Sequence, residues 1–133
     1  EERSATTGEA KALQIAPGDP VCAYHGLSLA DGQPIAVFES LFPLRRLTGI
    51  EEALNQTSSV TEALRLVGIS DYTRASTRLT AVRATATHAL HLQLSEGDPL
   101  LKSSGVNVDP AGMAVEFGRT WFAGDRATLT LEG

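Results

Sequence analysis

The sequence predicts an α/β domain of the α+β kind, built on a mainly antiparallel six-stranded sheet with flanking helices. Two observations support this prediction. Apolar-rich runs with alternating side chains are joined by short turn signals, which is typical of hairpins. Between them stand stretches whose apolar residues have helical spacing. Because hairpins dominate the order of elements, the strands are expected to pair mainly antiparallel, with the helices on one face.

The first hairpin is predicted near the start of the chain. Residues Val21 to Leu29 alternate in polarity, and Ile35 to Leu41 forms the return strand, which Pro43 ends. Asp31-Gly32 between them is a hairpin turn signal, because this pair favours the backbone conformation of a two-residue loop.

Two helices are predicted to follow this hairpin. Thr48 and Glu51 have capping-box spacing at the start of a short helix. The better helix runs from Ser59 to Val67, with a second capping box at its start and Gly68 at its end. Its apolar residues follow the i, i+3, i+4, i+7 rule: Val60, Ala63, Leu64 and Val67.

The rest of the chain predicts a strand over residues 74–83 and then a helix from Thr85 to Leu94. That helix should turn Ala86, Ala89 and Leu90 inward and end at Gly97-Asp98-Pro99. Three closing strands are expected to form a meander: Leu100 to Val108, Met113 to Phe122, and Ala127 to Glu132.

The bulk properties fit one ordinary globular domain. A length of 133 residues suits a single core, and 42% hydrophobic with 20% charged residues is a normal balance. No apolar run reaches the length of a membrane span, and no signal peptide is visible. Cys22 is the single cysteine, which excludes an internal disulfide and a cysteine-cluster zinc site. A reducing, cytoplasmic setting fits best.

The charge and the first residues suggest a missing partner domain. A formal net charge of -5 argues against this chain gripping nucleic acid by itself. Residues 1–12 are polar, rich in small residues and without apolar periodicity, and the first residue is Glu1. We therefore expect residues 1–12 to be a linker remnant, residues 13–133 to be the domain, and a further domain to precede them.

Most catalytic and cofactor motifs are not found. The sequence shows no phosphate-cradling loop with its lysine, no dinucleotide fingerprint and no nucleophile elbow. His88 and His91 stand three apart, and His25 is distant, without a supporting carboxylate pattern for a metal. The sequence therefore predicts no catalytic residue, no cofactor and no metal.

Some residues are compatible with an anion. The start of the Ser59 helix offers free N–H groups and the Ser59 and Thr61 hydroxyls, although Ser59 could equally cap its own helix. Positive charge at positions 74, 78 and 83 could serve a ligand or mark an exposed strand edge. Glu116 stands amid small residues, as on a ligand-holding face or on a solvated one.

The ordered motifs resemble a UTRA effector-binding domain. They are Pro17-Gly18-Asp19-Pro20-Val21, Leu29-Ala30-Asp31-Gly32-Gln33-Pro34-Ile35, Glu39, Pro43, Gly97-Asp98-Pro99-Leu100-Leu101, Asp109-x-x-Gly112, Val115-Glu116 and Gly124-Asp125-Arg126. Such domains follow a winged-helix DNA-binding domain in the HutC-type branch of the GntR family of bacterial transcription regulators. The resemblance covers Leu13 to Glu132 and implies a chorismate lyase-like fold.

A narrower resemblance is to regulators of phosphonate uptake and breakdown. It rests on Asp71-Tyr72-x-Arg74, on Ser76-Thr77-Arg78-Leu79-x-Ala81-x-Arg83, and on Glu116-Phe117-Gly118-Arg119-Thr120-x-Phe122-Ala123-Gly124-Asp125-Arg126.

The resemblance also implies a ligand site. Two arginines that hold the effector phosphate in sugar-phosphate sensors match Gly26 and Ser28, so a sugar phosphate is disfavoured. A family tyrosine matches Phe122, and Arg78 or Arg83 is expected to replace the lost charge. Alternation puts Tyr24 on the same side of its strand as Gly26. The candidate ligand-binding set is Ser59, Thr61, Arg78, Arg83, Glu116, Tyr24 and Phe122.

The function implied by the resemblance is sensing, without catalysis. We expect a domain that binds a small anionic metabolite, such as a phosphonate or phosphate-like ligand, and controls DNA binding of a homodimeric repressor. Operator DNA would be bound only through the missing N-terminal domain. The alternatives are a chorismate lyase-like enzyme acting on an anionic aromatic acid, and a dimerisation module without a ligand.

Overall fold

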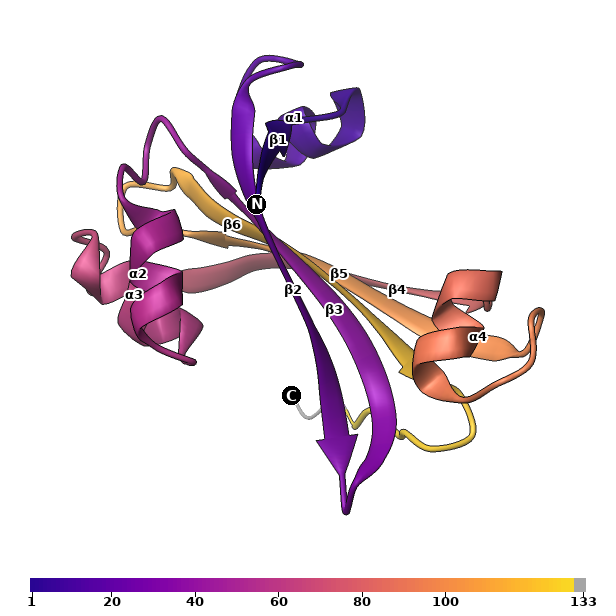
Figure 1. The fold of residues 1–133 in the computed structure, drawn as a ribbon. Coiled ribbons are helices and arrows are strands. Elements are labelled where there is room, and N and C mark those ends of the chain that lie inside the picture. The colour runs from indigo at the N-terminus through magenta and orange to yellow at the C-terminus, as the bar shows by residue number, and fades with distance from the viewer. Residues whose placement is uncertain (131–133) are drawn as a thin grey trace. The chain divides into compact units, whose positions relative to one another are not determined.

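The computed structural model describes residues 1–130. Its elements follow in the order β1 (Glu2–Ser4), α1 (Thr7–Leu13), β2 (Pro20–Ala30), β3 (Gln33–Pro43), α2 (Ile50–Gln56), α3 (Val60–Leu66), β4 (Thr73–Arg83), α4 (Ala86–Leu92), β5 (Pro99–Val108) and β6 (Ala114–Ala123). The strands form one antiparallel sheet in the order β1-β2-β3-β6-β5-β4 (Figure 1). This confirms the predicted fold class, a chorismate lyase-like α+β domain.

The chain divides into two compact units that share the long strands. Unit 1 comprises Glu1–Tyr24, Ser40–Thr77 and Gly105–Gly118, and unit 2 comprises His25–Glu39, Arg78–Ser104 and the chain from Arg119 onward. Each strand from β2 to β6 therefore contributes residues to both units.

Unit 1 contains α1, α2 and α3 and has two apolar clusters. The first packs α2 and α3 against buried residues of three strands, and its members are Cys22, Phe42, Leu47, Ile50, Ala53, Leu54, Ala63, Leu64 and Val115. The second packs Ala10 and Leu13 of α1 against Val21 and Leu41. Because β6 supplies Val115 to the first cluster and Ala114 to the second, this central strand is covered on both faces. The prediction of helices on one face is therefore wrong for unit 1.

Unit 2 contains α4, whose Ala89 and Leu92 pack with Leu100. The Arg126 guanidinium joins the end of this helix to the hairpin, because it donates hydrogen bonds to the carbonyls of Leu92 and Pro34. A planar guanidinium with several donors suits this role, since the last carbonyls of a helix lack partners within it.

The predicted hairpin and the best helix are confirmed. Asp31 (φ 51°) and Gly32 (φ 78°) form the turn between β2 and β3, and both have the positive φ that a two-residue type I′ turn requires. At the start of α3, the Ser59 hydroxyl accepts from the Glu62 amide at 3.2 Å. Gly68, at φ 97°, follows the helix end as predicted.

The N-terminal residues differ from the expected linker remnant. Residues 2–4 form β1, which pairs antiparallel with β2 in the register Glu2↔Cys22. Most of α1 also falls within residues 1–12, and Thr6 and Glu9 form a full capping box at its start. These residues show no apolar periodicity because a three-residue strand and a seven-residue helix bury only a few side chains.

The closing meander has two strands in the described residues, β5 and β6. Residues 127–130 form no strand, so the expected third strand is wrong over that range, and its last residues, 131 and 132, lie outside the described part. The predicted total of six strands is met because β1 takes the remaining place in the sheet.

Two helix boundaries also differ. The residue before α2 is Gly49 in a left-handed conformation without a side-chain cap, so the predicted Thr48–Glu51 capping box does not form. In α4, Leu90 is 77% exposed and Ala86 is also exposed, whereas Leu92 is buried. This helix ends at Gln93 in a left-handed conformation, before the predicted end at Gly97.

Removing the Phe42 ring should strongly destabilise the fold. Phe42 is fully buried in the first cluster of unit 1, so Phe42→Ala should lower the free energy of unfolding by about 3–5 kcal/mol. Denaturant unfolding followed by circular dichroism measures this loss. Leu90→Ala is the exposed control and should change it by less than about 0.5 kcal/mol. Equal losses in the two variants would contradict this core.

Candidate functional site

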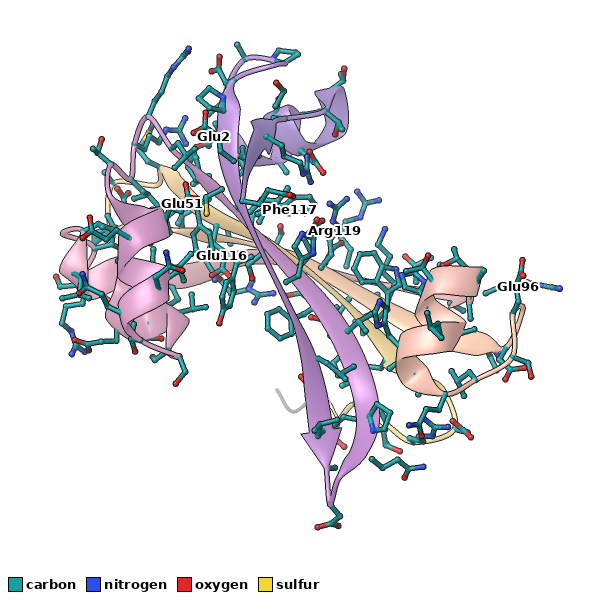
Figure 2. All side chains as sticks on the ribbon, viewed as in Figure 1. Glu2, Glu51, Glu96, Glu116, Phe117 and Arg119 are labelled. Atoms are coloured by element: carbon teal, nitrogen blue, oxygen red, sulfur yellow. The ribbon has the colours of Figure 1, made fainter. Side chains whose placement is uncertain are left out.

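A buried carboxylate forms the centre of the candidate site in unit 1. Glu116 on β6 is 8% exposed, and its Oε1 accepts a hydrogen bond from Asn107 Nδ2 at 2.9 Å (Figure 2). Arg74 Nε in turn donates to Asn107 Oδ1 at 2.9 Å. Only one orientation of the Asn107 amide satisfies both neighbours, because a carboxylate only accepts and a guanidinium only donates. The chain of hydrogen bonds therefore holds Glu116 in a defined position.

Gly118 has no side chain and leaves a space beside this carboxylate, called the recess below. A Cβ atom placed on Gly118 would lie 3.9 Å from Glu116 Oε2 and 3.9 Å from the hydroxyl of Ser40, which is itself 7% exposed. A carboxylate oxygen and a hydroxyl thus border the space that a side chain at position 118 would fill. Such a pair suits a ligand group that donates hydrogen bonds, since both oxygens can accept.

The start of α3 brings hydroxyl groups to unit 1. Ser59 caps its own helix, as one of the two sequence interpretations held. Thr61 Oγ1 lies 2.7 Å from the hydroxyl of Tyr72, and Tyr72 and Tyr24 both pack against the cluster beneath α3. Ser59, Thr61 and Tyr24 therefore belong to the same unit as Glu116.

The remaining predicted residues belong to unit 2. Arg78 and Arg83 are exposed on β4, the last strand in the sheet order, which agrees with the exposed-edge interpretation of these arginines. Phe122 on β6 is half-buried. Ser59 and Glu116 belong to unit 1. The contribution of Arg78, Arg83 and Phe122 to a site with them therefore stays a prediction.

The absence of an arginine at position 26 has a local cause. A Cβ on Gly26 would lie 2.2 Å from Cζ of Phe38, so the phenyl ring directly covers the backbone of Gly26. No larger side chain fits at position 26 while Phe38 keeps this place. Gly26, at the position of the family's phosphate-binding arginine, therefore fits the neighbouring Phe38 on β3.

Sequence reasoning missed Asn107, Ser40 and the role of Arg74. It counted Arg74 as available positive charge, but the guanidinium is used within the sheet, where it also bonds Thr77 Oγ1 at 3.3 Å. The interpretation of Glu116 as a solvated residue is wrong, because it is buried. Asn107 and Glu116 stand nine residues apart on paired strands, so only the register of β5 and β6 brings them together.

The histidines lie in unit 2 and form no metal site. In the described residues no group of three or more histidine, cysteine or acidic side chains could hold a metal ion. His25 Nε2 lies 3.4 Å from Glu39 Oε2, and the His88 ring lies 4.9 Å from that of Trp121. Burial, followed by the charges of His91 and Lys102, lowers the pKa of His88 below its ordinary value.

An antiparallel sheet of this order, with flanking helices, defines the class of the domain as chorismate lyase-like α+β. The model of the UTRA domain family matches residues 1–128. The chain belongs to the UTRA domain family.

Relatives agree with this assignment. The chain is 37% identical over 123 residues, 92% of its length, to an uncharacterised HTH-type transcriptional regulator of Rhizobium meliloti, and covers 50% of that protein. It spans half the length of this curated relative. This relative is a transcription regulator, and the chain is not an enzyme, as the sequence predicted. No helix in residues 1–130 is long and apolar enough to cross a membrane.

Solved structures show the same fold. The C-terminal domain of Yurk from Bacillus subtilis has a TM-score of 0.90 at 20% identity, with 100% of this chain and 92% of that chain covered. PhnF from Mycobacterium smegmatis has a TM-score of 0.86 at 25% identity, with 98% of this chain and 57% of that chain covered.

Breaking the hydrogen-bond chain at Asn107 should destabilise the domain. Asn107→Ala leaves the buried Glu116 carboxylate without this donor, so the free energy of unfolding should fall by about 1–3 kcal/mol. Asn55→Ala, on an exposed position of α2, is the control and should be nearly neutral. Denaturant unfolding measures both. If Asn107→Ala is also neutral, the bond to Glu116 does not stabilise the sheet.

The lowered pKa of His88 predicts a pH effect on stability. As pH falls below about 6.5, the ordinary value for histidine, the unfolded chain takes up a proton that folded His88 resists. The free energy of unfolding should therefore decrease from that pH down to the lowered folded pKa. Unfolding curves at several pH values, compared between wild type and His88→Phe, isolate this contribution. The wild type should lose more stability on acidification, and parallel pH profiles would contradict the shift.

Proposed function

We propose that this UTRA domain is the effector-sensing part of a GntR-family transcription regulator of the HutC branch, and that its effector is a small anion of the phosphonate or phosphate type. The observation that carries the proposal is the buried carboxylate of Glu116, held by Asn107 beside the recess at Gly118. Burying a carboxylate is costly unless it is hydrogen-bonded. Contacts with a bound effector would offset this cost, and a carboxylate already held in place is suited to making them.

One end of the ligand is assigned to this recess. Glu116 Oε2 and Ser40 Oγ border it, and both can accept hydrogen bonds from an amino or hydroxyl group. An aminoalkyl- or hydroxyalkylphosphonate has such a group at one end and a doubly charged anion at the other. Glu116 would therefore select the neutral or cationic end of the ligand and repel its anionic end.

The other end of the ligand is assigned to the start of α3. Ser59 and Thr61 offer hydroxyls there, and Thr61 is already paired with Tyr72. Hydroxyls alone do not balance a doubly charged anion, which needs charge-assisted donors once it leaves water. Since Phe38 excludes a side chain at Gly26, the formal charge is assigned to Arg78 or Arg83. Tyr24 and Phe122 are the remaining contacts of the predicted set.

Regulation would follow from a difference in affinity between two states. We propose that the complete protein is a homodimeric repressor that binds operator DNA through an N-terminal winged helix. The acidic charge of -5 makes the present domain itself unsuited to DNA. The effector can shift the dimer away from its DNA-binding form only by binding the other form more tightly.

Titration calorimetry tests the ligand class. Aminomethylphosphonate should bind more tightly than inorganic phosphate, and a neutral analogue of the same size should bind far more weakly. Arg78→Ala and Ser59→Ala should each weaken phosphonate binding by roughly tenfold or more, because a charged hydrogen bond contributes about 1.5–3 kcal/mol. Gly118→Ala should weaken the aminophosphonate selectively, because its Cβ enters the recess.

A matched control separates binding from folding. Ser59→Ala also removes a helix cap, and Thr85→Ala removes the corresponding cap of α4, where Thr85 Oγ1 accepts from the His88 amide at 3.2 Å. Thr85→Ala should cost similar stability, about 1 kcal/mol, and leave phosphonate affinity unchanged. Equal binding of the neutral analogue, or unchanged affinity in Ser59→Ala and Arg78→Ala, would refute the anion site. No binding of any anion would favour the dimerisation module.

A further inference from the structure

Unit 2 contains a cavity of its own, of about 440 Å³. The β2–β3 hairpin, α4 and β6 form its walls, with Leu27, Val37, Glu39, His88 and Trp121 among the lining residues. Its volume lies in the range of sites for small organic ligands. None of the residues assigned to the effector recess, namely Ser40, Ser59, Thr61, Glu116 and Gly118, lines it.

The walls are mainly apolar. Leu27, Val37 and Trp121 line the cavity, and Phe38, whose ring covers Gly26, also borders it. Leu27 is 44% exposed, so this apolar wall is open to solvent. The body of a ligand in this cavity should therefore be apolar, and the volume admits a single ring.

The charges at the cavity leave a positive excess. The carboxylate of Glu39 is 13% exposed and is bonded by Arg119, so these two charges compensate each other. Lys102 does not itself line the cavity, but its Nζ lies 5.6 Å from the centre of the ring of Trp121, which does, and it forms no ion pair within residues 1–130. Arg119 Cζ lies 5.9 Å from the same centre, so two cations flank the ring.

Histidines add hydrogen-bonding groups at the cavity. His25, 57% exposed, faces Glu39 at 3.4 Å, and His91 is an exposed lining residue. A neutral imidazole has an N–H group that can donate a hydrogen bond to a ligand anion. A cationic ligand is disfavoured, because the carboxylate of Glu39 already has Arg119 and His25 as partners.

We propose that the cavity under α4 is a second small-molecule site, which binds a monocarboxylic acid with an apolar body of single-ring size. The apolar walls hold the body, and the uncompensated charge of Lys102 balances the carboxylate. The effector recess in unit 1 is directed instead at a doubly charged anion with a hydrogen-bond donor. The two sites thus differ in ligand class, and the second does not depend on the first.

Trp121 offers a direct reporter for this site. It is the single tryptophan of the chain and lines the cavity. Tryptophan fluorescence, excited at the red edge of its absorption, therefore reports on the cavity in the intact chain. Benzoate should change the emission saturably. Benzamide, which has the same shape without the charge, and acetate, which has the charge without the ring, should each bind at least about tenfold more weakly.

Variants on one helix provide a matched pair. Thr87 lines the cavity and Ala86 does not, and both are exposed on α4. Thr87→Phe should abolish the saturable benzoate response by filling the cavity, whereas Ala86→Phe should leave it unchanged. Lys102→Gln, which leaves the cavity wall intact, should weaken benzoate by about tenfold and leave benzamide unaffected.

Benzoate binding at this cavity can be tested separately from phosphonate binding at the effector site. Ser59→Ala should bind benzoate as the wild type does, whether or not it still binds a phosphonate. Benzamide or benzylamine binding as tightly as benzoate would overturn the assigned charge. An unchanged benzoate response in both Thr87→Phe and Lys102→Gln, or no saturable response in the wild type, would overturn the site itself.

Discussion

Five strands of ten or eleven residues each serve both units, and the rest of the structure depends on this sharing. On β2 the division falls between Tyr24 and His25, and on β6 between Gly118 and Arg119. Each strand thus contributes one part of its length to one unit and the remaining part to the other. Because successive side chains point to opposite faces, a shift of one residue in register would rearrange the core and both proposed sites.

The buried polar chain of unit 1 shows how such a sheet can hold a binding group. Glu116 would be costly inside a covered sheet without hydrogen-bond partners. Asn107 on the neighbouring strand supplies one, and Arg74 on the next strand fixes the amide of Asn107. Gly105 makes room for this arginine, since a Cβ there would lie 1.9 Å from Arg74 Nη1. Three strands therefore hold one carboxylate beside the recess.

The sequence predicted correctly a turn and a helix cap that depend on a few adjacent residues. The Asp31-Gly32 turn and the cap at Ser59 are properties of a few adjacent residues, and both are present. The strand β1 was missed because its three residues gain their structure by pairing with β2. Leu90 was expected inward on helical spacing, but the cavity side of α4 is lined by Thr87, His88 and His91 instead.

The candidate site was predictable only in part, for the same reason. Glu116, Ser59 and Thr61 could be chosen from the sequence because a carboxylate amid small residues and a hydroxyl-bearing helix start are visible in single stretches of the chain. Their hydrogen-bond partners lie elsewhere in the chain: Asn107, the partner of Glu116, is on another strand, and Tyr72, the partner of Thr61, follows the helix. Likewise, the glycine at position 26 is explained by Phe38, twelve residues later on the paired strand. Such contacts follow from register, which the sequence of one strand does not reveal.

The most direct test of the central claim is an amide nuclear magnetic resonance titration of the chain with aminomethylphosphonate. The largest chemical-shift changes should occur, saturating together, at the amides of residues 59–62, of Ser40 and of residues 116–118. The amides of residues 86–92, in α4, should change little. Saturable changes confined to other residues, or no saturable change, would contradict the assignment of the effector to Glu116 and the start of α3.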